Sequence, residues 1–187
     1  SGISGSTSNS WAMTGNAGTN PATDFIGTTD NQPLKLRVNN TKSGEIHPTS
    51  ANTYFGLNTG LGTTSGMYNS AFGFEALKTN TTGYNNTAVG VWALLQNTTG
   101  FYNAAVGTNS MASNLTGSQN TSVGVSAMYF NTSGASNTAL GFESLKSNTI
   151  GTQNTALGVT ALKFNIDGIY NTATGHQALL FNTSGSQ

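Results

Sequence analysis

Residues 86–102 read Asn-Thr-Ala-Val-Gly-Val-Trp-Ala-Leu-Leu-Gln-Asn-Thr-Thr-Gly-Phe-Tyr, and this pattern recurs every 17 residues from Asn52 to Gln187. Eight copies account for that stretch with no residue left over. An asparagine at the first position and two glycines occur at the same positions of all eight copies. They are Asn52, Asn69, Asn86, Asn103, Asn120, Asn137, Asn154 and Asn171; Gly56, Gly73, Gly90, Gly107, Gly124, Gly141, Gly158 and Gly175; and Gly66, Gly83, Gly100, Gly117, Gly134, Gly151, Gly168 and Gly185. A strict period of this length predicts a solenoid whose units stack on their neighbours.

Within each copy, apolar residues two positions apart indicate a short strand, because side chains at such positions share one face. Val89 and Val91 form one such pair, and Phe72 and Phe74 form another. We therefore expect a strand of about five residues in each copy. Strands that stack at about 4.8 Å would give eight coils a length of roughly 38 Å.

Further rows of the repeat supply packing and turns. Small residues such as Ala88 and Ala93 recur in phase and indicate close approach of another backbone. Asn-Thr-Thr-Gly is typical of a turn, and stacked Asn amides are expected to bond one another along the axis. A helix over residues 74–78 and its copies would be one turn at most, because Asn, Gly and β-branched neighbours do not sustain it. A second apolar row comprises Leu77, Leu94, Met111, Met128, Leu145, Leu162 and Leu179.

The chain divides into residues 1–51, an N-terminal cap or connector module, and residues 52–187, the eight repeats. The module holds all three prolines and six of the twelve charged residues. The alternation of Leu34, Leu36 and Val38 predicts a half-buried strand within residues 32–39, closed by a turn at Asn39-Asn40. Residues 24–30 are a second candidate for a short strand. A cap fits this position, because the apolar end of a solenoid generally needs cover.

Composition excludes several classes of function. Charged residues make up 6% of the chain, against about 25% in ordinary globular domains, and the formal net charge is zero. Without a basic patch, we expect no nucleic-acid partner. Without an apolar run near 20 residues, we expect no membrane insertion. The absence of cysteine excludes disulfides and thiolate metal sites.

Candidate catalytic and cofactor chemistry is sparse. No paired carboxylates, Ser-His-Asp arrangement or phosphate loop occur, so we predict a protein that is not an enzyme and uses no metal or cofactor. His47 and His176 stand in unrelated contexts. Asn-x-Ser/Thr occurs at positions such as Asn80, Asn97, Asn131 and Asn182, either as glycan acceptors or as by-products of the turn. Candidate contacts with a ligand or with another protomer are the aromatic residues Tyr68, Tyr84, Phe101, Tyr102 and Tyr170.

The repeat resembles a known family at Asn-Thr/Ser-Ala-Val/Leu-Gly. It is similar to the Asn-Ser-x-x-Ile-Gly motif of trimeric autotransporter adhesin heads. The spelling at residues 137–145, Asn-Thr-Ala-Leu-Gly-Phe-Glu-Ser-Leu, looks like repeats of phage tail-fibre-like and bacterial surface proteins, many of which end in an endosialidase-type chaperone. Residues 18–34 look like a module that precedes such arrays. The resemblance implies an all-β fold, a left-handed β-roll, in a homotrimer that is extracellular, on a cell surface or on a virion.

These observations lead to a structural fibre or adhesin shaft as the expected function, with self and a cell-surface glycan or receptor as partners. An ice-binding solenoid is one alternative, and it would present threonine at the same position of every copy. A subunit of an extracellular filament is another, with residues 1–51 of one copy covering the last coil of the next. A fragment or processed chain is the favoured explanation for why Gln187 closes a repeat in phase. A sugar lyase on a β-helix would need clustered acids, which are not found.

Overall fold

A computed structural model describes residues 17–20 and 22–186; residues 1–16, residue 21 and Gln187 lie outside the description. The described chain contains ten strands and no helix, so no helix in this part is long and apolar enough to span a bilayer. One sheet holds all the strands in chain order. The strands are β1 (Leu34–Val38), β2 (Thr41–His47), β3 (Asn52–Phe55), β4 (Ser70–Phe72), β5 (Thr87–Val89), β6 (Ala104–Val106), β7 (Thr121–Val123), β8 (Thr138–Leu140), β9 (Thr155–Leu157) and β10 (Thr172–Thr174).

The sheet begins with an antiparallel hairpin. β1 pairs with β2, and β2 pairs antiparallel with β3. The turn between β1 and β2 is Asn39-Asn40, whose φ angles of 46° and 56° suit a tight hairpin turn. The strand predicted within residues 32–39 is therefore confirmed, but its half-burial is wrong: only Leu34 is partly buried, and Leu36 and Val38 are exposed. The strand predicted at residues 24–30 is wrong: that segment is exposed and irregular, because no neighbouring strand supplies its hydrogen bonds.

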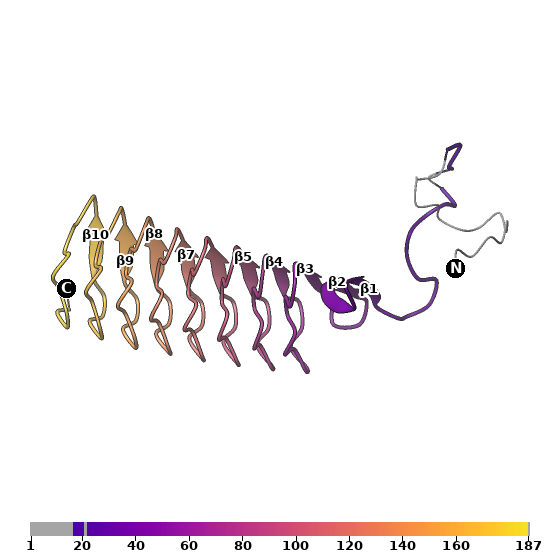
Figure 1. Cartoon of the computed structure of the whole chain (residues 1–187). Coiled ribbons are helices and arrows are strands. Elements are labelled where there is room, and N and C mark those ends of the chain that lie inside the picture. The colour runs from indigo at the N-terminus through magenta and orange to yellow at the C-terminus, as the bar shows by residue number, and fades with distance from the viewer. Residues whose placement is uncertain (1–16, 21, 187) are drawn as a thin grey trace.

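From β3 onward all pairing is parallel, and each strand is followed by its copy 17 residues later. Ser70 faces Thr87, Thr87 faces Ala104, and the same offset holds through β10. Successive coils therefore lie on one another as rungs of a long, narrow array (Figure 1). The chain makes about seven full turns between its first and last repeat strands. The all-β solenoid of 17-residue coils is confirmed, whereas the left hand of the coil stays a prediction.

Glycine limits each of β4 to β10 to three residues, so the predicted strand length of about five is wrong. After Val89, Gly90 adopts a φ of 133°, a conformation that side chains rarely permit. A Cβ at Gly90 would lie 2.7 Å from the carbonyl oxygen of Gly107 on the next rung. Only glycine thus allows the chain to leave the strand while the neighbouring coil stays close.

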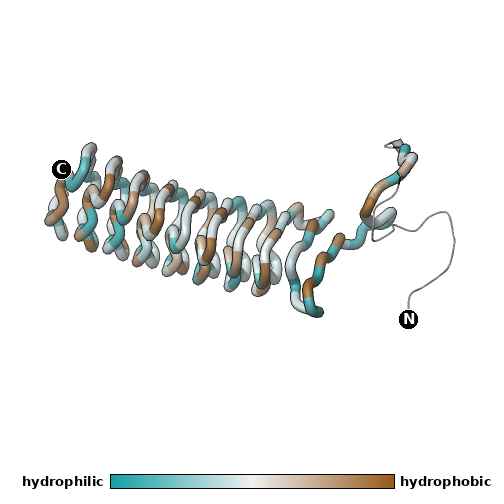
Figure 2. The backbone as a smooth tube through the Cα atoms, turned by 45° about the horizontal axis from the view of Figure 1, so that its top comes forward, coloured by the Kyte–Doolittle hydropathy of each residue, from teal (hydrophilic) through white to brown (hydrophobic). Residues whose placement is uncertain are grey.

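The core is narrow and is built from a few repeated side chains. Leu94 and the two alanines of its coil, Ala88 and Ala93, are completely buried, and their copies stack above and below them. Figure 2 shows that apolar segments recur at the same place in successive coils. Leu94 has a left-handed φ of 50°, which costs roughly 1–2 kcal/mol for an L-residue. Repeated packing of this row offsets that cost.

Two buried asparagine ladders run along the array. In the first, both the backbone N–H and the Nδ2 of Asn103 donate to Asn86 Oδ1, at 3.0 and 3.1 Å. Nδ2 also donates to Gly117 O at 2.8 Å. In the second, Asn97 Nδ2 donates to Asn80 Oδ1 at 2.8 Å. The predicted bonding of Asn amides along the axis is confirmed, and it satisfies polar groups that would otherwise be costly to bury.

The first coil departs from the repeat in three linked positions. Tyr54 replaces the buried alanine, Gly60 replaces the buried leucine, and Thr63 replaces the asparagine of the second ladder. The Tyr54 ring fills the space next to Gly60, where a Cβ would lie 2.5 Å from a ring carbon. The Tyr54 hydroxyl bonds Thr63 Oγ1 at 3.1 Å. These changes close the end of the core beneath the hairpin.

We expect Asn103→Ala to lower the free energy of unfolding by about 3 kcal/mol. The substitution leaves the buried Asn120 N–H without its acceptor, and it removes one of the two hydrogen bonds at Asn120 Nδ2 and one of the two at Gly117 O. Urea unfolding followed by circular dichroism measures the loss. Thr121→Ala is the matched control, because Ala104 already occupies that position one coil earlier; an equal loss in both variants would contradict the role of the ladder.

A second expectation concerns Tyr54 and Gly60. Tyr54→Ala should cost about 3 kcal/mol by leaving a void, and Gly60→Leu should cost about 1–3 kcal/mol by collision with the ring. The double variant restores the pair found at Ala71 and Leu77, so its loss should be about 2 kcal/mol smaller than the sum. The same unfolding assay gives the coupling free energy between the two positions. A loss in the double variant equal to the sum of the two single losses would contradict the packing of Tyr54 against Gly60.

Candidate functional site

An exposed apolar band runs along the outer side of the solenoid. It consists of the last residue of each repeat strand and the residue two positions later. Most of these side chains are 36–51% exposed, and those of Val123 and Leu157 are half-buried. Thr108, Thr174 and His176 hold the remaining positions of the two rows. The band comprises Phe55, Leu57, Phe72, Phe74, Val89, Val91, Val106, Val123, Val125, Leu140, Phe142, Leu157 and Val159.

Strand alternation and glycine together place these side chains outside. Within β5, Ala88 points into the core, so Thr87 and Val89 point outward. Gly90 then turns the chain, and Val91 is 37% exposed. The sequence identified Val89 and Val91 as a stacked pair but did not assign them to the outer face. The signal available was the small residue, Ala or Ser, that lies between the two outward positions of every repeat strand after the first.

Side chains of the band stack on their copies along the axis. The rings of Phe55 and Phe72 are 5.8 Å apart and nearly parallel. Beside them, Phe74 and Trp92 meet edge to face at 6.2 Å. The band is therefore a regular series of apolar ridges and grooves with the spacing of the rungs.

Charged residues next to the band are paired. Glu75 binds Lys78 at 2.7 Å and accepts from Trp92 Nε1 at 3.3 Å. Glu143 pairs with Lys146 and, at 2.7 Å, with Lys163 of the next coil. Hydrogen bonding to Lys78 lowers the pKa of Glu75, and hydrogen bonds from the two lysines lower the pKa of Glu143.

The five aromatic residues singled out from the sequence do not form one surface. Tyr84 stacks on Phe101 with ring centroids 5.0 Å apart, and Tyr102 meets both edge to face. Tyr68 stands at the position of Tyr102 two coils earlier, and Tyr170 stands there four coils later, roughly 19 Å away. Because Tyr84 and Phe101 cover one another's faces, this cluster is better suited to stabilising its rungs than to stacking on a ligand.

The remaining candidates carry little chemistry. Among the described residues, no three His, Cys, Asp or Glu side chains are grouped so as to hold a metal ion. His47 lies in β2 and His176 follows β10, so the fold does not bring the histidines together. The Asn-x-Ser/Thr residues Asn80, Asn97 and Asn131 are completely buried in the second ladder, so the folded chain does not present them to a glycosylating enzyme. Asn182, in the last coil, donates to Asn165 Oδ1 but is partly exposed.

Comparisons with known proteins found no matching family model, no matching curated protein and no matching solved structure.

The paired carboxylates predict acid sensitivity. A carboxyl whose folded pKa lies below its ordinary value of 4.5 stabilises the fold above that value, and the contribution is lost as pH falls through the folded pKa. We expect the thermal midpoint to fall between about pH 5 and pH 3. The double variant Glu75→Gln/Glu143→Gln should lose a few degrees at pH 7 and fall less steeply. Identical pH profiles for both proteins, from calorimetry, would contradict this expectation.

Proposed function

We propose that the protein is a non-enzymatic structural shaft of a fibre or adhesin whose apolar band binds further copies of the same chain. By resemblance, the assembly is a homotrimer outside the cell or on a virion, where it provides reach, rigidity and attachment to a cell-surface glycan or receptor. The observation that supports the proposal is the uncharged, regular band along a rigid solenoid.

The area of the band favours a large partner. Its two rows cover about 38 Å by 10 Å, or roughly 400 Å², which already matches the largest patch on a typical monomer. The adjacent threonine row of the strands widens the uncharged face to roughly 600–750 Å². A stable protein interface needs about 800 Å² from each partner, so nearly the whole face would be covered by one docking event.

The spacing of the band favours a second copy over an unrelated partner. Ridges such as Phe72 and Val89 recur once per rung, and only a partner with the same spacing fits every groove along that length. The six charged residues of the repeats are three acids and three bases, so copies approach without net repulsion. A cyclic arrangement about an axis parallel to the solenoid aligns all copies in one direction, as a shaft requires.

Ice binding is the second candidate, because the threonines of the strands lie in register on the same face. Thr121, Thr138 and Thr155 face one another across successive strands. Ser70 and Ala104 interrupt the row. In a cooling assay, depression of the freezing point without change of the melting point would support this function. Ice binding also requires that no second copy of the chain covers this face.

The filament alternative has less support from the geometry. A copy that stacked seamlessly would add a parallel strand to β3, but β2 already pairs with that edge in the antiparallel sense.

The lyase alternative lacks its acids: within the described repeats, Glu75 and Glu143 lie four coils apart and each is paired with lysine.

The test replaces band residues with charge. Val106→Glu/Val125→Glu puts two carboxylates on neighbouring rungs of the face, where docking would bury them at high cost. We expect the parent chain to have three times the 19.2 kDa mass of one chain and the variant to be monomeric. Gel filtration with light scattering measures both masses.

The matched control is Ile150→Glu/Ile166→Glu, which adds the same charges to exposed isoleucines on neighbouring coils outside the band. It should keep the parent mass. A monomeric parent chain at every concentration would refute self-association, and dissociation of the control would show that charge alone drives the change.

A further inference from the structure

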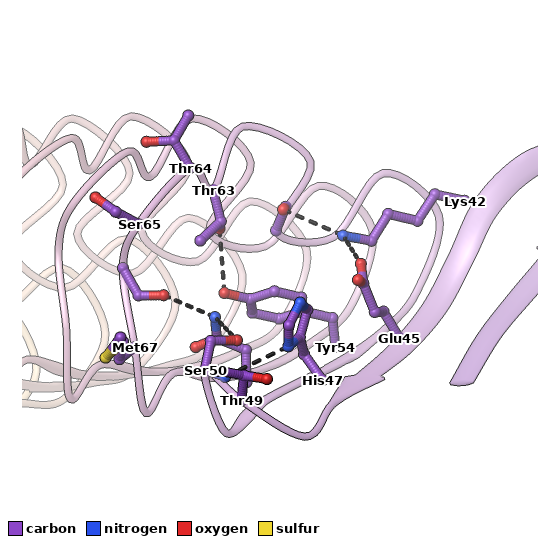
Figure 3. A pocket seen from close by; sticks show the side chains of 13 residues that line it. Lys42, Glu45, His47, Thr49, Ser50, Tyr54, Thr63, Thr64, Ser65 and Met67 are labelled. Atoms are coloured by element: carbon purple, nitrogen blue, oxygen red, sulfur yellow. Dashed lines mark hydrogen bonds and ion pairs between the residues drawn. The ribbon is translucent and has the colours of Figure 1, made fainter. Parts of the chain in front are cut away.

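The end of the solenoid under the hairpin contains a polar cavity of about 430 Å³ between β2 and the first coil. Figure 3 shows its lining, which includes Lys42, Glu45 and His47 from β2 and Thr63, Thr64 and Ser65 from the coil. This volume lies within the range of roughly 300–1,000 Å³ that is usual for small-molecule sites. Nothing in the repeat pattern requires such a space, since at every later coil the preceding rung fills it.

The cavity exists because the first coil has no coil before it. In the second coil, Thr81 O accepts three N–H groups, from Thr64, Ser65 and Gly66, at 3.0–3.1 Å. Thr64 O is the equivalent acceptor of the first coil, and no donor from the described residues reaches it. The hairpin covers only the strand side, so this rim of the coil stays open to a ligand with hydrogen-bond donors.

The charges of the lining cancel. Lys42 Nζ lies 2.6 Å from Glu45 Oε2, donates to Gly60 O at 3.3 Å, and lies 4.9 Å from the centre of the Tyr54 ring. These contacts fix the ammonium and leave the second carboxylate oxygen of Glu45 as an acceptor. A ligand with a net charge would find no unpaired opposite charge here.

The other polar groups of the lining are neutral and both give and take hydrogen bonds. His47 accepts the Ser50 N–H through Nδ1 at 3.4 Å, which leaves its Nε2 as a donor in the neutral ring. Ser65 adds a hydroxyl on the coil side, and Met67, 42% exposed, adds apolar surface. Hydrogen-bonding groups on both sides of the cavity, Glu45 and His47 from β2 and Thr64 O and Ser65 from the coil, together with one apolar patch, match a ring that carries several hydroxyl groups.

We propose that this cavity binds one neutral sugar residue, with Glu45 and Thr64 O as acceptors and His47 and Ser65 as further hydrogen-bonding groups. The sugar would be either a free monosaccharide or the terminal residue of a glycan. The site is separate from the apolar band and does not depend on self-association, although it would give an attachment function to one end of a shaft.

Saturation-transfer NMR on the full chain tests the proposal, with glucose, galactose, mannose, N-acetylglucosamine and their methyl glycosides as probes. We expect at least one sugar to bind with millimolar affinity. Equal binding of the methyl glycoside indicates a glycan end, whereas binding of the free sugar alone indicates a monosaccharide.

Ser65→Ile is the blocking variant, because Ile150 occupies the same position of a later coil and the backbone there accepts it. It should reduce the signal at least fivefold. Ser133→Ile makes the same change outside the cavity and should leave the signal unchanged. His47→Ala, which alters no coil, should also reduce the signal if Ser65→Ile fails to fold.

No transfer to any probe, or a signal that persists in Ser65→Ile and His47→Ala, would overturn the proposal. Light scattering on the same samples measures the mass of the assembly, so the sugar site and the proposed self-association are tested independently. A parent chain that is trimeric but binds no sugar refutes only the sugar site, and a parent chain that is monomeric but binds sugar refutes only the shaft.

Discussion

Hydrogen bonding between identical positions of successive coils is the interaction on which the structure depends. From Asn69 onward, each Asn of the first ladder gives two hydrogen bonds to the Asn one coil earlier and a third to a glycine carbonyl, as Asn103 does. These bonds fix the rung spacing, and the spacing determines which residues can occupy every other position. Glycine is required where backbones touch, as at Gly90, and small side chains are required where the core is two residues wide.

A chain with so few charges and such a narrow core stays ordered because polar groups of one coil form hydrogen bonds with polar groups of the neighbouring coils. Asn and Thr, which usually favour turns or solvent, here contribute to the interior of the array. Thr59, for example, is completely buried and donates from its hydroxyl to Gly73 O on the next rung. The left-handed backbone of Leu94 and its copies is held by the same packing, so local strain and long-range regularity occur together.

The repeat, its period and the stacking of coils were predictable from sequence, because Asn86, Gly90 and Gly100 recur without a slip over eight copies. Two features were not. The outward direction of Val89 and Val91 depends on where Gly90 ends the strand, and a two-residue spacing alone does not tell inside from outside. The end cavity depends on how the hairpin covers the first coil, which has no coil before it, and the repeat pattern carries no signal for that contact. The aromatic residues were visible in the sequence, but not their mutual stacking, in which Tyr84 and Phe101 each cover one face of the other's ring.

The exchange of Tyr54 and Gly60 at one end also bears on how such a gene can change. Interior coils are interchangeable, since each meets the same neighbours on both sides, whereas the first coil is tied to its hairpin. Recombination between misaligned copies can therefore lengthen or shorten the array in whole 17-residue steps without new solutions for folding. The number of coils would then be the property of this protein that changes most readily, while the first coil and its hairpin stay the same.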